Sequence, residues 1–251
     1  MFRDKPFQPL LEYERIDGKS LRYMTIRQSG SPHHVAFIHG APGSSSDFLN
    51  YFLSDSLCMQ ANLLSVDRPG YGYSDFGEYT PIYEQATMIA EVLRSAMNMQ
   101  PFVLVCHSYG GPVAGKIAMD HPELVRALIM LAPAIDPDLE VIWFVAKMAA
   151  VPAFGKLVPA ALRVASEEKL HHAAELRQLE SLWKTIQCPV CHVHGTGDLI
   201  VPYRNILFSK KHLDQRLLHA LTLKGAGHFL PWTHQSLVMD LVKQYTQSEN
   251  K

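Results

Sequence analysis

Apolar and polar positions follow two different rhythms along this chain. Residues 10–28 hold two strand-like runs, LLEYERI and LRYMTIRQ, on either side of Asp17-Gly18, and an Asp-Gly pair in this setting is typical of a β-hairpin. Beyond it, short and almost wholly apolar runs are typical of strands buried on both faces of a sheet. These runs span residues 34–40, 62–67, 102–108, 126–133 and 189–195.

Helical periodicity fills the intervals between the buried runs. The clearest example covers about residues 83–97 and follows Thr80-Pro81, a typical helix start. One more strand is predicted at residues 217–223 and a last helix at 233–245. Strands that alternate with helices predict an α/β fold with a parallel sheet and right-handed crossovers.

The alternation stops between residues 135 and 185, where the pattern is helical and contains no strand. We interpret this segment as a helical cap inserted into one α/β domain that spans residues 1–251. Its large apolar side chains could roof a pocket or simply pack onto the core. They are Ile142, Trp143, Phe144, Met148, Phe154, Leu157, Val158, Leu162 and Trp183.

Composition narrows the kind of partner to expect. Of the 251 residues, 47% are hydrophobic and 19% are charged, which is ordinary for a globular protein with a sizeable core. Lysine and arginine number 23 against 24 aspartates and glutamates, so there is no overall positive field to hold a nucleic acid. We therefore expect a small-molecule ligand and no nucleic acid, and the composition leaves the oligomeric state open.

The first residues and the cysteines suggest where the protein is located and whether its thiols are free. The first twenty residues contain charges and two prolines where a secretory signal needs an apolar core, so a cytoplasmic location is expected. The most apolar stretch, 139–155, is interrupted by charges and a proline, so we expect no stable membrane insertion. The cysteines are expected to be free thiols, and they are Cys58, Cys106, Cys188 and Cys191.

One segment, LVCHSYGGPVAG, carries the pattern of a nucleophile elbow. Ser108 lies between a buried run and a small-residue stretch that begins a helix, and a sharp turn there would hold its hydroxyl clear of the backbone. Such a turn needs small residues two positions away, which are Cys106 and Gly110. Cys106 departs from the usual G-x-S-x-G pattern by one CH2-SH group, which leaves the geometry of the turn open.

Backbone amides near Ser108 are candidates for an oxyanion hole. A helix that begins behind the serine offers N–H groups and a positive dipole end, and Tyr109 N–H is the natural first donor. The loop HGAPG at residues 39–43 follows another buried run, and we nominate Ala41 N–H as the second donor. A Gly-Pro loop can also be an ordinary turn.

A serine hydroxyl needs a base that a carboxylate orients. Asp198 in GTGD and His228 in GAGH each follow a predicted strand. The chain order Ser, Asp, His is the one expected for this type of fold, and parallel strands carry their sites at the carboxyl ends. Asp136, after the run at 126–133, is the alternative carboxylate.

Four motifs together resemble the α/β-hydrolase superfamily: HGAPG, VDRPGYGYSD at 66–75, CHSYGG, and the GTGD and GAGH pair. The resemblance implies an eight-stranded, mostly parallel sheet with helices on both faces and a lid after the sixth strand. Dehalogenases and epoxide hydrolases of this fold use an aspartate where this chain has Ser108. The resemblance also implies structural roles, without catalysis, for Asp67, Arg68, Pro69, Gly70 and Gly72.

Two other readings of the sequence are set aside. The string from Cys188 to His192 matches a c-type haem attachment site, but it overlaps a predicted buried strand and no export signal precedes it. A zinc site would need a second ligand pair, which is missing. His39 and His107 flank the proposed site and could support it or simply pack there.

The sequence therefore predicts a serine hydrolase that cleaves a carboxylic ester or thioester of a small to medium, partly apolar acyl group. The reaction would pass through an acyl-enzyme on Ser108, with His228 as base and Asp198 as its orienting carboxylate, and would need no metal or cofactor. Carbon-carbon bond hydrolysis, a lyase step and perhydrolysis use the same residues and stay open. A ligand receptor without catalysis is the alternative from another class.

Overall fold

The computed structural model describes residues 2–96, 100–140 and 158–247, and its centre is one eight-stranded sheet in the order β1-β2-β4-β3-β5-β6-β7-β8. β1 and β2 pair antiparallel, β2 runs antiparallel to β4, and the other neighbours are parallel. This confirms the expected α/β-hydrolase fold. The strands are β1 Leu10–Ile16, β2 Lys19–Ile26, β3 His34–Ile38, β4 Asn62–Val66, β5 Phe102–His107, β6 Val125–Leu131, β7 Val190–Gly195 and β8 Leu218–Leu223.

The predicted hairpin is present at the edge of the sheet. Ile16 pairs with Lys19, and the two residues between them, Asp17 and Gly18, have φ angles of 49° and 83°. Positive φ at both central positions is what a two-residue hairpin turn requires, and it explains the Asp-Gly pair.

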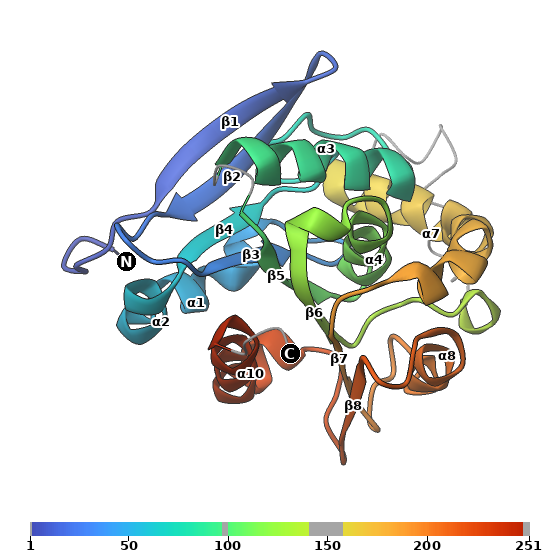
Figure 1. Ribbon diagram of the computed structural model, residues 1–251. Helices are drawn as coiled ribbons and strands as arrows, with labels where there is room; N and C mark the ends of the chain where they lie inside the picture. The colour runs from blue at the N-terminus through green and yellow to red at the C-terminus, as the bar shows by residue number, and fades with distance from the viewer. Residues whose placement is uncertain (1, 97–99, 141–157, 248–251) are drawn as a thin grey trace.

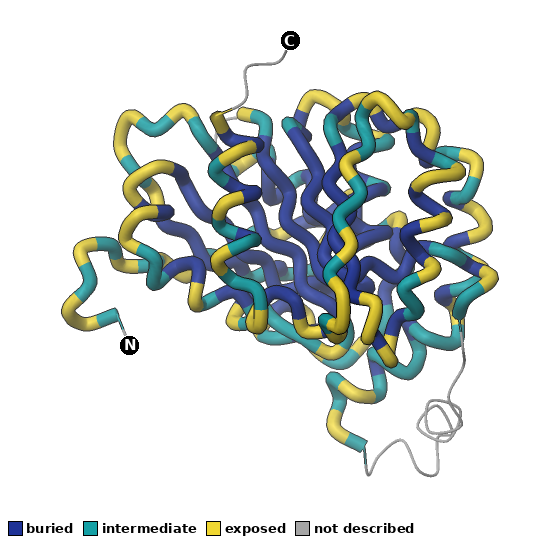
Figure 2. The backbone as a smooth tube through the Cα atoms, turned by 90° about the horizontal axis from the view of Figure 1, so that it is seen from below, coloured by how far each residue is buried: buried dark blue, intermediate teal, exposed yellow. Residues whose placement is uncertain are grey.

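Helices cover both faces of the sheet (Figure 1), and the central strands β3 to β7 are almost entirely buried (Figure 2). One apolar core lies under α3 Ile82–Ala96, α4 Gly110–Asp120, α7 Ala160–Leu179, η4 Glu180–Thr185 and α8 Asn205–His212. The opposite core lies under η1 Ser45–Phe48, α1 Leu49–Phe52, α2 Asp55–Gln60, α9 Leu230–Thr233 and α10 Gln235–Gln247.

The segment between β6 and β7 is helical in the part that the structure describes. It contains η3 Pro137–Leu139, α7 and η4, while residues 141–157, which hold six of the apolar side chains proposed to roof a pocket, lie outside the described residues. Trp183, another of that set, is buried in the core against α4 and Phe208. Trp183 therefore packs onto the core and does not line the roof of a pocket.

The structure also bears on the expectations of free thiols and of no membrane-spanning helix. All four cysteines are free and buried, and Cys191 and His192 lie inside β7, where no haem could attach. Within residues 2–96, 100–140 and 158–247, none of the helices combines the length and apolar character needed to cross a bilayer.

Parallel pairing brings the carboxyl ends of the central strands to one edge of the sheet. Ile38 of β3 lies beside Cys106 of β5, and Gly195 of β7 lies beside Leu223 of β8. The residues that follow these strands therefore emerge along the same edge, which is where open α/β sheets place their sites.

Replacing Gly115 with alanine tests the packing of α4 on η4. A Cβ at this position would come within 2.6 Å of the Trp183 ring, so we expect a loss of about 1–3 kcal/mol of unfolding free energy from overpacking. Urea denaturation measures the loss. The matched control is Gly227→Ala, because no atom lies within 4 Å of a Cβ there. Equal stability of the two variants would contradict this packing.

Candidate active site

Ser108 occupies a strained turn directly after β5. Its φ is 53°, and such positive values persist in a non-glycine residue only when the surrounding structure imposes them. Here Ser108 N–H donates to the Leu131 carbonyl at 3.1 Å, and the Ser108 carbonyl accepts from Gly111 N–H at 2.9 Å. The turn therefore holds a serine side chain at the start of α4.

Cys106 fits this turn although the usual pattern has glycine. The residue lies in β5 with its side chain buried, and its Sγ is 3.6 Å from the Ile129 carbonyl oxygen. Burial raises the pKa of the Cys106 thiol above its ordinary value, so the group stays protonated and unreactive. The larger side chain is taken up by the sheet, and the neighbouring turn keeps its positive φ.

Asp198 and His228 form a hydrogen-bonded pair between the loops that follow β7 and β8. His228 Nδ1 lies 2.8 Å from Asp198 Oδ2, and Asp198 Oδ1 accepts from Ile200 N–H and Val201 N–H, both at 2.9 Å. Burial by itself raises the pKa of Asp198, but hydrogen bonds from His194 and His228 hold it below its ordinary value. The carboxylate is thus an acceptor, so His228 Nδ1 carries the proton and Nε2 is left as the basic nitrogen.

His107 joins the loop of His228 to the strand that leads into Ser108. The His107 and His228 rings lie 4.7 Å apart, and His107 Nε2 is 3.0 Å from the His228 carbonyl oxygen. Burial, together with the nearby His228, lowers the pKa of His107 to about 3, so the ring is neutral. Because a carbonyl only accepts, Nε2 carries the His107 proton. The sequence left open whether His107 supports the proposed site or only packs beside it. Its contacts with His228 favour a supporting role.

Asp136, the alternative carboxylate, has a different role. Its Oδ1 accepts from Asp138 N–H at 2.9 Å, so it caps the short helix η3. The described carboxylate that contacts His228 is the one on Asp198.

Two buried histidines behind Asp198 were not foreseen from the sequence. His194 Nε2 lies 3.3 Å from Asp198 Oδ2 and 3.1 Å from the Val201 carbonyl oxygen. His192 Nε2 lies 3.0 Å from His194 Nδ1, and His192 Nδ1 lies 2.7 Å from Ser209 Oγ. Both neighbours of His194 Nε2 are acceptors, so this nitrogen carries a proton that Asp198 shares.

The loop after β3 lies against the turn of Ser108. A Cβ on Gly40 would lie 3.0 Å from Ser108 Cβ, so a larger residue would push this loop or the serine aside by a few tenths of an ångström. In the part of the chain that the structure describes, neither Ala41 N–H nor Tyr109 N–H donates to a protein acceptor. The Ala41 and Tyr109 N–H groups are therefore candidates to donate to an oxyanion formed on Ser108.

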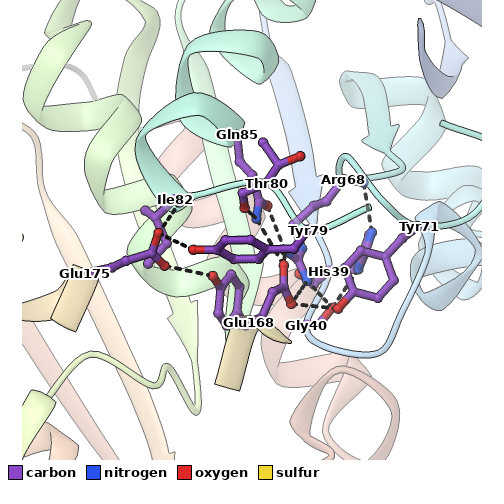
Figure 3. A network of polar contacts seen from close by, with 11 residues as sticks. His39, Gly40, Arg68, Tyr71, Tyr79, Thr80, Ile82, Gln85, Glu168 and Glu175 are labelled. Carbon is purple, nitrogen blue, oxygen red and sulfur yellow. Dashed lines mark hydrogen bonds and ion pairs between the residues drawn. The ribbon is translucent and has the colours of Figure 1, made fainter. Parts of the chain in front are cut away.

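Arg68 fixes the orientation of this loop from behind (Figure 3). Its Nε donates to the His39 carbonyl at 2.9 Å and its Nη2 to the Gly40 carbonyl at 2.8 Å. Burial and the nearby Arg68 lower the pKa of His39 well below its ordinary value. The neutral His39 ring accepts from Arg68 N–H at Nε2, and its Nδ1 donates to the Gly40 carbonyl at 2.7 Å. Arg68 thus has the structural role that its motif implies.

Planarity converts these carbonyl contacts into an orientation for Ala41 N–H. The Gly40 carbonyl and the Ala41 N–H belong to one planar trans peptide, so they point in opposite directions. With the carbonyl held by Arg68 and His39, the N–H faces away from both. The side chains of Arg68 and His39 therefore set the direction of the Ala41 N–H.

Glu168 completes the buried charge around Arg68, and sequence reasoning missed it. Glu168 Oε1 lies 2.6 Å from Arg68 Nη1, and both side chains are fully buried. A lone glutamate in a helical pattern carries no motif, and 100 positions separate it from Arg68. Its burial beside the apolar residues that α7 also buries could be found only from the folded chain.

Comparisons with known proteins give both family and fold. The model of a family described as the alpha/beta hydrolase family matches residues 35–241. A 1-acylglycerol-3-phosphate O-acyltransferase of Arabidopsis thaliana is 33% identical over 112 residues, covering 43% of this chain and 26% of the relative. An sn-1-specific diacylglycerol lipase of Danio rerio is 29% identical over 133 residues, covering 51% of this chain and 37% of the relative. The chain thus spans well under half of these relatives.

A solved structure extends the likeness over nearly the whole chain. An epoxide hydrolase without ligand superimposes with a TM-score of 0.75 at 18% identity, covering 95% of this chain and 98% of that chain. At this identity the likeness is one of fold.

The depressed pKa of Asp198 predicts a pH-dependent contribution to stability. A carboxyl whose folded pKa lies below its ordinary 3.8 stabilises the fold above about pH 4 and loses that contribution as the pH falls through the folded value. Asp198→Asn should cost about 1–3 kcal/mol at pH 7, because an amide has one acceptor oxygen and its NH2 group cannot accept from the Ile200 and Val201 N–H groups. Urea denaturation from pH 7 to 2.5 should show the gap to wild type narrowing below about pH 4. A constant gap would contradict the assignment.

Proposed function

The chain belongs to the α/β-hydrolase family, and from this premise we propose that it is a serine hydrolase that cleaves carboxylic esters or thioesters. The observation that carries the proposal is the hydrogen bond between His228 and Asp198 beside the turn that holds Ser108 at positive φ. A neutral imidazole held by a buried carboxylate is the base that a serine nucleophile requires.

The chemistry proceeds in two halves on this proposal. Ser108 Oγ attacks the carbonyl carbon while its proton passes to His228 Nε2, and Asp198 stabilises the imidazolium. The tetrahedral oxyanion accepts hydrogen bonds from Ala41 N–H and Tyr109 N–H. His228 then gives the proton to the leaving alcohol or thiol, which leaves an acyl-enzyme. Water repeats the sequence, releases the acid and returns the proton to Ser108.

A partly apolar acyl group suits the surface next to these residues. Large apolar side chains are exposed directly after Asp198 and directly after His228, where they would contact the substrate. They are Leu199, Ile200, Phe229 and Trp232. The names of the lipase and the acyltransferase among the relatives also refer to acyl esters, which favours an ester over carbon-carbon cleavage.

Activity-based labelling tests the proposal most directly. A fluorophosphonate should label the pure protein, and peptide mapping should place the label on Ser108. A panel of short p-nitrophenyl esters should be hydrolysed, whereas a vinylogous diketone and a cyanohydrin should not react. Turnover of the diketone without ester turnover would replace the proposal with carbon-carbon hydrolysis, and absence of both labelling and turnover would reject catalysis.

Removing the nucleophile should abolish turnover and leave the fold intact. Ser108→Ala should lower kcat on a p-nitrophenyl ester by about 10⁴ to 10⁶, as in other triads. The exposed Ser56 on α2 supplies the control, since Ser56→Ala should keep full activity. Wild-type kcat in pure Ser108→Ala protein would end the proposal.

His194 should act through Asp198 as a positioning residue. His194→Leu removes a donor to the carboxylate, so kcat should fall about tenfold to a hundredfold, the rate equivalent of one hydrogen bond to a charged group. His194→Gln restores an N–H near the same place and should recover most of the loss. Steady-state kinetics measure both variants, with the exposed His219→Gln as control. Equal kcat in the leucine and glutamine variants would contradict this role.

A further inference from the structure

Helix α7 presents two carboxylates toward the back of the proposed oxyanion hole. Glu168 and Glu175 are separated by about two helical turns, so both lie on one face of the helix. Glu168 accepts from Arg68, and Glu175 accepts from Tyr79 (Figure 3). Glu175 also accepts from the Tyr109 hydroxyl. The helix follows β6 in the chain, so it is far in sequence from the loop of Ala41 and from the turn of Ser108 and Tyr109.

The first carboxylate controls the loop of Ala41 through Arg68. Glu168 Oε1 accepts from Arg68 Nη1 at 2.6 Å, and Oε2 accepts from Tyr71 OH at 2.6 Å. Gln85 bonds to both members of the ion pair, since its Oε1 accepts from Arg68 Nη1 and its Nε2 donates to Glu168 Oε1. The guanidinium then has its remaining N–H groups directed at the His39 and Gly40 carbonyls. Glu168 thereby fixes the plane of the Gly40–Ala41 peptide.

The second carboxylate holds the residue that supplies the other amide. Glu175 Oε2 accepts from Tyr109 OH at 3.3 Å, while Oε1 accepts from Tyr79 OH at 2.8 Å and Ile82 N–H at 3.2 Å. Burial and the carboxylates of Glu168 and Glu175 raise the pKa of Tyr109 well above its ordinary value, so its phenol stays a donor.

Arg68 also links the surroundings of the two carboxylates, because two tyrosine rings pack on its guanidinium. The guanidinium carbon lies 4.7 Å from the Tyr71 ring centroid and 4.7 Å from the Tyr109 ring centroid. The ring of Tyr109 therefore packs on the same cation that holds the Gly40 carbonyl. A shift of the guanidinium would disturb the supports of both amides together.

We propose that α7 sets the geometry of the oxyanion hole, with Glu168 and Glu175 as positioning residues for the amides of Ala41 and Tyr109. This inference rests on the proposed function, because it assigns a role to residues behind the same site. Neither glutamate touches the reacting atoms, and each acts through a side chain that contacts a donor peptide.

A positioning role predicts a particular kinetic signature. Donors of an oxyanion hole stabilise charge that develops only in the transition state, and loss of one costs about 10² to 10³ in kcat. A donor that is tilted and still present should cost less, and substrate affinity should be nearly unchanged. A glutamate that only stabilises the fold would lower the melting temperature and leave kcat of the folded protein alone.

The experiment compares Glu168→Gln and Glu175→Gln with Glu167→Gln. Glu167 is the adjacent residue of α7 and makes no hydrogen bond or ion pair with another described residue, so it controls for charge removal on the helix. For each protein we would measure kcat and KM on p-nitrophenyl butyrate and inhibition by phenylboronic acid. When the boronic acid adds to a serine its boron becomes tetrahedral, and one boronate oxygen takes the place of the oxyanion, so the inhibition constant reports on the oxyanion hole.

We expect Glu168→Gln to lower kcat at least tenfold and Glu175→Gln severalfold, with KM within about threefold. The boronate inhibition constant should rise by the same factor as kcat falls, and Glu167→Gln should match wild type. Folded variants with unchanged kcat and unchanged boronate inhibition would overturn the inference. A change in KM alone would also overturn it.

A second comparison covers the case in which Glu168→Gln does not fold, since breaking a buried ion pair strongly destabilises a protein. Tyr109→Phe removes the hydroxyl that Glu175 accepts from and keeps the backbone amide. If Glu175 acts through this contact, Tyr109→Phe, Glu175→Gln and the double variant should lose similar amounts of kcat. Additive losses would overturn this part of the inference.

The two proposals fail in different ways. Wild-type protein that a fluorophosphonate does not label and that hydrolyses no ester would reject the serine hydrolase itself. Labelled and active wild type, together with active glutamine variants, would reject only the role of α7.

Discussion

The arrangement of this site depends on one planar peptide, the bond between Gly40 and Ala41. Its carbonyl is held by the Arg68 guanidinium and the His39 ring, so planarity turns its N–H in the opposite direction. Gly40 also brings this peptide against Ser108. The fixed direction of the amide matters because a preorganised donor loses no energy to reorientation when charge develops.

Buried charge is used on both sides of the proposed nucleophile. Behind the loop of Ala41, the Arg68 and Glu168 pair is fully buried and is surrounded by donors and acceptors that satisfy it. Behind His228, Asp198 is buried and accepts from backbone amides and from two histidines. Such groups are costly to bury unless they are fully partnered, so each network fixes the backbone around it.

The sheet makes these two networks neighbours. Parallel pairing places the ends of β3, β5, β7 and β8 along one edge, and each of these strands is followed by one residue of the proposed site. These residues are Ala41, Ser108, Asp198 and His228. Asp198 and His228 are therefore separated along the chain and hydrogen-bonded in space, and His228 also contacts His107, the residue before Ser108. Helix α7 is the exception, because it reaches the same edge from the segment between β6 and β7.

The α/β class, the hairpin, the strands and most helices could be predicted from the sequence, because burial on both faces and helical periodicity are local patterns. It also singled out Ser108, Asp198 and His228, since each lies in a short motif after a strand. It could not reveal His194 and Glu168, which have no motif and gain partners only on folding. It favoured Asp198 and kept Asp136 as the alternative, without showing the contacts of either carboxylate. Tertiary structure decided these points, because hydrogen bonds and buried ion pairs depend on distances between residues that the chain order does not contain.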